Sequence, residues 1–265
     1  MRSAVVLLFV AAIACQRAPA PDLLNSGVWI DLSYDFSPDT IFWPTAKRFE
    51  LQIESAGRTP AGYYYAANNL FTSEHGGTHL DAPLHFAEGK WATDQIPLER
   101  LVGPAVVVDV TNHAANPDYQ ITPDALEAWE RANGPIPDGA IVLFRTGWGR
   151  HWPDPVKYLG TARTGPEAVA ELHFPGIHPE TARWLTARGT IDAIGIDTAS
   201  IDYGQSSTFD THQILFAANI PAFENVAQLD RLPARGSVVV ALPMKIKGGS
   251  GGPLRIVAVV PRDAF

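Results

Sequence analysis

Cysteine is almost absent from this sequence, and long apolar runs and an excess of positive charge are missing. Its 265 residues contain a single cysteine, Cys15, so no disulfide can form within one chain. Residues 4–13 form an apolar run that is too short to cross a bilayer, because a membrane-spanning helix needs about 20 residues. The formal net charge of −8 disfavours nucleic acid or an anionic membrane surface as a partner.

The composition is that of an ordinary globular protein. Hydrophobic residues make up 46% of the chain and charged residues 18%, and a mass of 28.7 kDa is enough to bury a sizeable core. The 22 prolines and 22 glycines are spread along the sequence, which indicates many turns and short elements. We therefore expect one domain over residues 27–265.

The N-terminus is typical of an exported protein. Met1 and Arg2 provide a positively charged start, and the apolar run 4–13 has the length of a signal-peptide core. We therefore expect residues 1–15 to be an export signal.

Cys15 adds a second feature to this signal. The small and apolar residues directly before it resemble a bacterial lipobox, in which the cysteine is acylated. Residues 16–26 would then be a tether, and the protein would be periplasmic or a membrane-anchored lipoprotein. Ordinary cleavage after Ala14 or a few residues later, without lipidation, is the alternative.

Three of the eight histidines stand within eleven residues, together with a carboxylate. His75, His79, Asp81 and His85 offer imidazole nitrogens and a carboxylate oxygen, which are the ligands of zinc, manganese or ferrous iron at catalytic centres. No thiolate is nearby, which argues against a closed structural zinc site. The cluster predicts an open metal site that activates water, and the simpler alternative is a loop of solvated histidines.

Spacing within the cluster favours an extended segment. Glycine costs about 1 kcal/mol and proline about 3 kcal/mol in a helix, so the paired glycines after His75 and Pro83 disfavour one. In an extended segment His79 and Asp81 point to the same side. The paired glycines would let the chain fold back and bring His75 toward them.

Apolar runs and capping residues predict the secondary structure. Helices are expected at residues 123–133, before Gly134, and at 178–188, before Gly189. The sequence therefore predicts a mixed α/β fold, with a largely antiparallel sheet and flanking helices. Strands are expected at residues 28–32, 63–70, 104–110, 140–144, 191–196, 238–246 and 254–260, the last two as a hairpin.

The loop of that hairpin, residues 248–252, fits the G-x-S-x-G pattern of serine hydrolases around Ser250. Their nucleophile elbow needs a helix directly after the serine. Pro253 and a strand-like run follow instead, so we interpret the segment as a hairpin loop.

A second polar region, residues 195–204, lies at the end of a predicted strand and includes Ser200. Polar loops after a strand commonly line a site. His212 and Glu224 follow it. By themselves, His212 could be a hydrogen-bonded core histidine and Glu224 a surface acid.

Taken together, these residues resemble the metal-dependent cyclase-type amidohydrolases, a family that includes bacterial kynurenine formamidases and isatin hydrolases. The resemblance covers nearly all of the expected domain, and residues 197–204 and 219–226 are more similar to the isatin hydrolase branch. The residues that carry it are His75-x-Gly77-Thr78-His79-x-Asp81-x-Pro83-x-His85, Phe42-Trp43-Pro44, the segment 195–204, and His212 with Glu224 twelve residues on.

The resemblance implies a role for each ligand-type residue. His75, His79 and Asp81 correspond to the ligands of a principal metal, and His212 and Glu224 to a second cluster. The cofactor would be Mn²⁺ or Zn²⁺, as one or two ions. The family fold is a swivelling β/β/α domain that is often dimeric, so we expect a homodimer.

The resemblance also implies which residues act on the substrate. His85 corresponds to a catalytic acid/base, and His212 to a proton-transfer residue where a single manganese is bound. Trp43 corresponds to an aromatic that contacts the substrate, and Phe42 and Ser200 are expected beside it. Three further aromatics, Tyr63, Tyr64 and Phe71, are candidate walls for a flat substrate.

These roles imply hydrolysis of a small aromatic or cyclic amide. A metal ion polarises the carbonyl and lowers the pKa of water to about 7. His85, whose ordinary pKa is near 6.5, can pass a proton from water to the leaving nitrogen. Opening of isatin to isatinate is the first hypothesis. Hydrolysis of N-formylkynurenine is the second, and opening of a lactone is the third. A metal- or solute-binding lipoprotein without catalysis is an alternative of another class.

Overall fold

The computed structural model describes residues 23–113 and 115–264 of the chain. The expected export signal, residues 1–15, lies outside them, and so does most of the expected tether. The last part of that tether, Leu23–Ser26, forms a short helix, α1. Among the described residues, no helix combines the length and apolar character that a membrane span requires.

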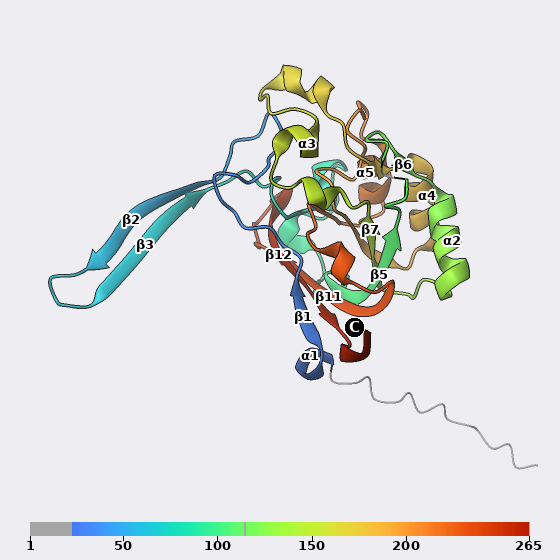
Figure 1. Ribbon diagram of the computed structural model, residues 1–265, viewed down its shortest axis with the longest axis horizontal. Helices are drawn as coiled ribbons and strands as arrows, with labels where there is room; N and C mark the ends of the chain where they lie inside the picture. Colours follow the sequence, from blue (N-terminus) through green and yellow to red (C-terminus); the bar gives the residue numbers. More distant parts are fainter. Residues whose placement is uncertain (1–22, 114, 265) are drawn as a thin grey trace, which may run out of the picture.

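A mixed sheet forms the centre of the protein (Figure 1). Its strands are β1 (Val28–Asp31), β4 (His79–Asp81), β5 (Val102–Asp109), β7 (Ala140–Arg145), β9 (Ile191–Ile196), β10 (Ala222–Glu224), β11 (Arg235–Pro243) and β12 (Gly251–Val260). Their order is β1-β12-β11-β5-β7-β9-β10-β4, and β4 also pairs with β12, so the sheet closes as a barrel. The pairs β5–β7, β7–β9 and β9–β10 are parallel and the others antiparallel, which confirms the expected largely antiparallel sheet.

Alternating side chains of the barrel strands feed two hydrophobic cores. Along β7, Ile141 and Leu143 belong to an inner core that draws side chains from every strand of the barrel. Val142 and Phe144 belong to an outer core, between the sheet and the helices that cover it (Figure 1). These helices are α2 (Pro123–Asn133), α4 (Pro179–Arg188) and α5 (Asp210–Ala217).

Both predicted helices, α2 and α4, are confirmed with their predicted ends at Gly134 and Gly189. The predicted hairpin is β11–β12. The sequence did not predict β4, β10 or α5. Strands β4 and β10 are three residues long, which is too short to show an alternating pattern. Other short elements include α3 (Pro155–Leu159) and the parallel pair β6 (Gln120–Ile121) and β8 (Gly176–Ile177).

An antiparallel ribbon, β2 (Glu50–Arg58) and β3 (Tyr64–Phe71), projects from the body of the protein (Figure 1). Most of its side chains are exposed, Tyr64 at 66%. The candidate substrate walls Tyr63, Tyr64 and Phe71 lie on or next to this ribbon. None of the three lines the cavity that contains the predicted metal ligands, so this chain does not meet the expectation. Sequence alone does not separate a cavity aromatic from a surface aromatic.

Candidate metal centre

Strands β4 and β10 bring imidazole and carboxylate groups together. His79 and Asp81 alternate with Leu80, which is buried in the inner core, so the two polar side chains share the other side of β4. In the antiparallel pair, Glu224 of β10 stands directly opposite His79. His79 Nε2 lies 3.2 Å from Asp81 Oδ1 and 3.5 Å from Glu224 Oε2.

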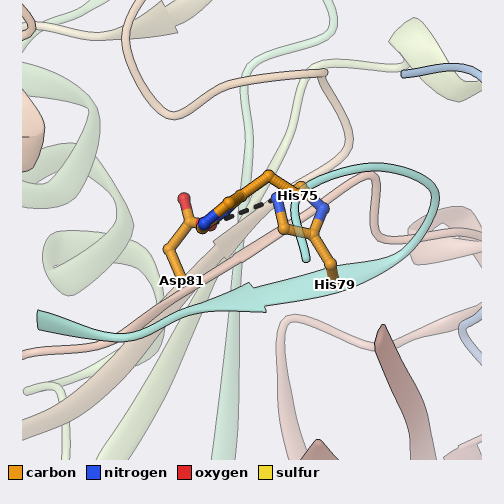
Figure 2. Close-up of side chains that lie close together, drawn as sticks. All are labelled: His75, His79 and Asp81. Atoms are coloured by element: carbon orange, nitrogen blue, oxygen red, sulfur yellow. Dashed lines mark hydrogen bonds and ion pairs between the residues drawn. The ribbon is translucent and has the colours of Figure 1, made fainter. Parts of the chain in front are cut away.

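His75 joins this group from the loop before β4, which curls back over the strand (Figure 2). Gly76 packs so closely on Phe42 that a Cβ there would lie 2.0 Å from the ring, and Gly77 has a φ of +57°. Only glycines allow this path. His75 Nδ1 therefore reaches a point 2.5 Å from Asp81 Oδ1, as the paired glycines predicted.

Helix α5 places His212 on the other side of Asp81. Its Nε2 lies 3.3 Å from Asp81 Oδ2 and 3.2 Å from Glu224 Oε1. Its Nδ1 lies 2.6 Å from Asp202 Oδ2, which also accepts the His212 backbone N–H. Asp202 therefore orients the His212 ring. Asp202 belongs to the polar segment 195–204, but sequence reasoning assigned it no role.

Asp81 is shared by two groups of potential ligands. His75, His79 and Asp81 form one group, and Asp81, His212 and Glu224 form the other. Within each group, the ligand atoms lie within 4.8 Å of one another. The structure thus brings together all five residues that the sequence predicts as metal ligands, while their roles as ligands stay a prediction.

The donor set fits a divalent cation. His79 Nδ1–H donates to the Gly77 carbonyl at 2.9 Å, so neutral His79 keeps a lone pair on Nε2. Among the described residues, this buried Nε2 has no hydrogen-bond partner, although Asp81 and Glu224 face it. Three converging acceptors repel one another unless a proton or a metal ion lies between them.

The pKa values in the cluster are set by burial and by the charges of the neighbouring side chains, which act in opposite directions on His79 and Asp81. Burial lowers the pKa of His79, but the Asp81 and Glu224 carboxylates outweigh it and raise that pKa to about 9. Burial acts against ionised Asp81, yet His75 and His79 hold its pKa well below the usual range. Burial and the Asp81 charge raise the pKa of Glu224. Without a cation the cluster therefore holds protons, which a metal ion would displace.

His85 lies beside the ligands and outside both groups. Its ring stacks on His75 with 3.8 Å between centroids, and its centroid lies 6.2 Å from that of His212. Burial, together with the neighbouring histidines, outweighs the Asp81 charge and lowers the pKa of His85 to about 4. His85 is therefore neutral near pH 7, and its acid/base role stays a prediction.

A cavity of about 290 Å³ is lined by the cluster and by the three predicted substrate residues, Phe42, Trp43 and Ser200. Phe86 and Phe209 also line it, and sequence reasoning missed both because a lone aromatic gives no signal of a cavity. Within the part of the chain that the structure describes, no lysine or arginine lines this cavity. Apart from the cluster, its walls are largely apolar and include four aromatic side chains, Phe42, Trp43, Phe86 and Phe209.

Comparisons with known proteins agree with this site. Residues 30–203 match the family described as "Putative cyclase". The isatin hydrolase of Roseibium aggregatum is 35% identical over 210 residues, which cover 76% of this chain and 77% of that protein. The kynurenine formamidase of Salinibacter ruber is 32% identical over 239 residues, which cover 89% of this chain and 97% of that protein.

A solved structure shares the fold as well. The crystal structure of an isatin hydrolase bound to the product analogue thioisatinate has a TM-score of 0.81 and 30% identity. The match covers 91% of this chain and 95% of that one. The chain therefore belongs to the cyclase family of metal-dependent amide hydrolases.

Proposed function

We propose that this protein opens the lactam ring of isatin to give isatinate. The observation that carries the proposal is the lining of the cavity, where aromatic side chains meet the His/Asp/Glu cluster and, among the described residues, no lysine or arginine stands. Isatin is flat and uncharged, whereas N-formylkynurenine carries a carboxylate and an ammonium group. Burying such charges without partners is costly. The isatin hydrolase relatives support the same substrate.

The reaction adds water across the amide bond. Water attacks the carbonyl carbon, the carbon–nitrogen bond breaks, one proton of the water goes to nitrogen and the other is released, so the ring-opened product carries a carboxylate and an aryl amine. When bound by His75, His79 and Asp81, a divalent cation would supply positive charge that polarises the carbonyl and acidifies water. His85 accepts the proton of the attacking water at an imidazole nitrogen and delivers it to the leaving nitrogen.

His212 and Glu224 complete the site on its second side. Asp202 accepts the His212 Nδ1–H, so His212 Nε2 faces Asp81 and Glu224. We propose that Asp81, His212 and Glu224 bind a second ion. Where only one ion is present, we propose that His212 transfers protons. Mn²⁺ and Zn²⁺ both suit nitrogen and oxygen ligands, and elemental analysis of the purified protein counts the ions and identifies them.

Aromatic side chains hold the substrate in this proposal. Trp43 makes edge contacts with Phe174 and Phe209, at centroid distances of 6.4 and 6.2 Å, which hold its ring in place. Phe42 and Ser200 contribute an apolar face and a hydroxyl to the same cavity.

Isatin loses its visible colour on ring opening, which gives a direct assay. We expect kcat/KM for isatin to exceed that for N-formylkynurenine and for simple lactones. A preference for N-formylkynurenine would contradict the substrate assignment. A metal-loaded protein that hydrolyses none of the three would favour a non-catalytic metal- or solute-binding lipoprotein.

We also propose that the protein is exported and anchored through a lipid on Cys15, as the apolar run 4–13 and the lipobox-like residues support. In a bacterial host the full chain should fractionate with membranes. Cys15→Ser should release it to the periplasm. Wild-type protein in the cytoplasm would contradict export, and wild-type protein free in the periplasm would contradict lipidation.

We further propose a homodimer in which the β2–β3 ribbon packs on a second copy. An isolated two-stranded ribbon is marginally stable in water, and Ile53 on this one is 70% exposed. Light scattering should give twice the chain mass. Ile53→Glu should weaken the dimer, whereas Leu98→Glu, which changes an exposed leucine on the body of the protein, should not.

A further inference from the structure

We propose that Ser250 and Glu74 hold His75 in the orientation and tautomer that direct its Nδ1 lone pair to the metal site. Ser250 belongs to the β11–β12 loop, whose G-x-S-x-G pattern lacks the helix of a nucleophile elbow. It is 175 positions from His75 in sequence, yet Ser250 Oγ lies 2.9 Å from His75 Nε2. The inference rests on the proposed metal centre and is independent of the substrate.

Glu74 determines where the serine hydroxyl points. Its Oε2 accepts the Ser250 backbone N–H at 3.0 Å and lies 2.6 Å from Ser250 Oγ. A carboxylate is only an acceptor, so the hydroxyl hydrogen of Ser250 points to Glu74. Ser250 Oγ can then only accept a hydrogen bond from His75, which places a proton on His75 Nε2.

This proton leaves Nδ1 of His75 to face Asp81, 2.5 Å away. His79 follows the same rule with its nitrogens exchanged, because the Gly77 carbonyl holds the Nδ1 proton and Nε2 faces the site. Hydrogen bonds to the distant N–H of a metal-binding imidazole fix its ring and make it more basic. Ser250 and Glu74 thus fix the tautomer and the ring orientation of His75, as the Gly77 carbonyl does for His79.

The loop that carries Ser250 is built against the histidine. The Ala82 backbone N–H donates to the Ser250 carbonyl at 2.9 Å. A Cβ at Gly251 would lie 2.5 Å from His75 Cε1, so the imidazole packs directly on the loop backbone. The Ser250 backbone is therefore held by Ala82 and the next residue, Gly251, packs on the His75 ring, which together keep the Ser250 hydroxyl beside the imidazole.

A Ser250–His75–Asp81 chain could also be read as a nucleophilic triad. In such a triad the serine donates its hydrogen to the histidine. Here that hydrogen goes to Glu74, and Ser250 is not among the residues that line the substrate cavity. The geometry therefore points to a positioning residue and not to a nucleophile.

Mn²⁺ affinity of the purified full chain, measured by titration calorimetry, tests the proposal. Ser250→Ala and Glu74→Ala should each raise the Kd for Mn²⁺ by about 10–100-fold, whereas Ser250→Thr, which keeps the hydroxyl, should bind like wild type. Ser33→Ala is the matched control. Its hydroxyl also donates to and accepts from β12, through Ile256, without touching an imidazole.

The imidazole ¹⁵N spectrum of the cation-free protein is a second readout that does not depend on activity. We expect Nε2 of His75 to carry a proton in wild type, and to carry it in a smaller fraction of the molecules in Glu74→Ala, the variant that carries the test if Ser250→Ala does not fold. An unchanged Kd in both alanine variants, a wild-type His75 without an Nε2 proton, or labelling of Ser250 by a fluorophosphonate would each overturn the proposal. Normal Mn²⁺ binding without isatin turnover would instead overturn only the proposed function.

Discussion

Glu224 and His79 are direct cross-strand partners in the β10–β4 pair, with 3.5 Å between Glu224 Oε2 and His79 Nε2. Backbone hydrogen bonds of two buried strands therefore set the distance between these two potential ligands. A slip of one residue would turn Glu224 to the other side of the sheet. The three potential ligands on these strands, His79, Asp81 and Glu224, are therefore held in position before any metal binds.

Metal binding should stabilise the folded protein, and His79→Ala should remove this effect. A ligand present at about 100 times its Kd adds about 2.7 kcal/mol to the free energy of unfolding. For a chain of this length, that raises Tm by about 5–10 °C. Calorimetric scans with Mn²⁺ and with a chelator measure the difference. His173→Ala removes a partly exposed histidine paired with Asp118 and should keep the full rise.

His85→Ala should separate catalysis from metal binding. Isatin turnover should fall by about 10²–10⁴-fold, because a positioned acid/base contributes that much. Metal content should stay at the wild-type level, since His85 belongs to neither ligand group. Parallel kinetic and elemental analyses check both statements. Near-normal turnover, or a matching loss of metal, would contradict the assigned role.

Asp202→Asn should lower activity through His212. The amide lacks the charge that holds the His212 Nδ1–H at 2.6 Å, so the ring loses its fixed orientation. We expect kcat to fall by about 10–100-fold with little change in KM. Asp118→Asn is the matched control, because Asp118 also pairs with a histidine, His173, but on the surface. An effect confined to KM would point to the substrate cavity instead.

Asp197 should make the stability of the protein depend on pH. Its carboxylate accepts hydrogen bonds from Thr146 N–H, the Thr146 hydroxyl and Gly147 N–H at 2.8, 2.6 and 2.8 Å. Burial nevertheless raises the pKa of Asp197. The folded state therefore binds this proton more tightly than the unfolded chain, in which aspartate titrates near pH 3.9. Its contribution to stability is greatest at acidic pH.

That contribution should be lost as pH rises from about 4 through the folded-state pKa, by at most about 1.4 kcal/mol per pH unit. Asp197→Asn does not titrate and should remove this slope, besides weakening the bonds to Thr146 and Gly147. Urea unfolding of both proteins across this pH range measures it. A constant difference between the two proteins would show that Asp197 has the same pKa folded and unfolded.

Leu143→Ala should destabilise the barrel by about 2–5 kcal/mol, because the residue is fully buried in the inner core and its removal leaves a cavity. Leu98→Ala makes the same chemical change at a position that is 67% exposed and should cost less than about 0.5 kcal/mol. Urea unfolding compares them. Equal losses would contradict the position of Leu143 inside the barrel.

Hydrophobic patterning was sufficient for the long elements of this fold. Strand β7 is a continuous apolar run between turn residues, and α4 stands between His178 and Gly189. Strand β2 shows no such pattern, because the side chains on both of its faces are exposed or only partly buried. Strands β4 and β10 are three residues long, and only their pairing with neighbouring strands makes them part of the sheet.

Within the site, the sequence by itself determined the chemistry of the local group. His75, His79 and Asp81 lie within seven residues, so their spacing and the paired glycines already bring their side chains together. The resemblance to the cyclase family extended this to His212 and Glu224. Neither source assigned a role to Asp202 or identified Phe86 and Phe209 as cavity aromatics.

Only the tertiary structure decided that Glu224 faces His79, that Asp202 orients His212, and that Ser250 contacts His75. These partners are far apart in sequence or lie on different elements. Their distances depend on strand order, register and the closure of the barrel by β4 and β12. Local spacing constrains only a few consecutive residues, whereas the register of paired strands is selected by the burial of the whole core.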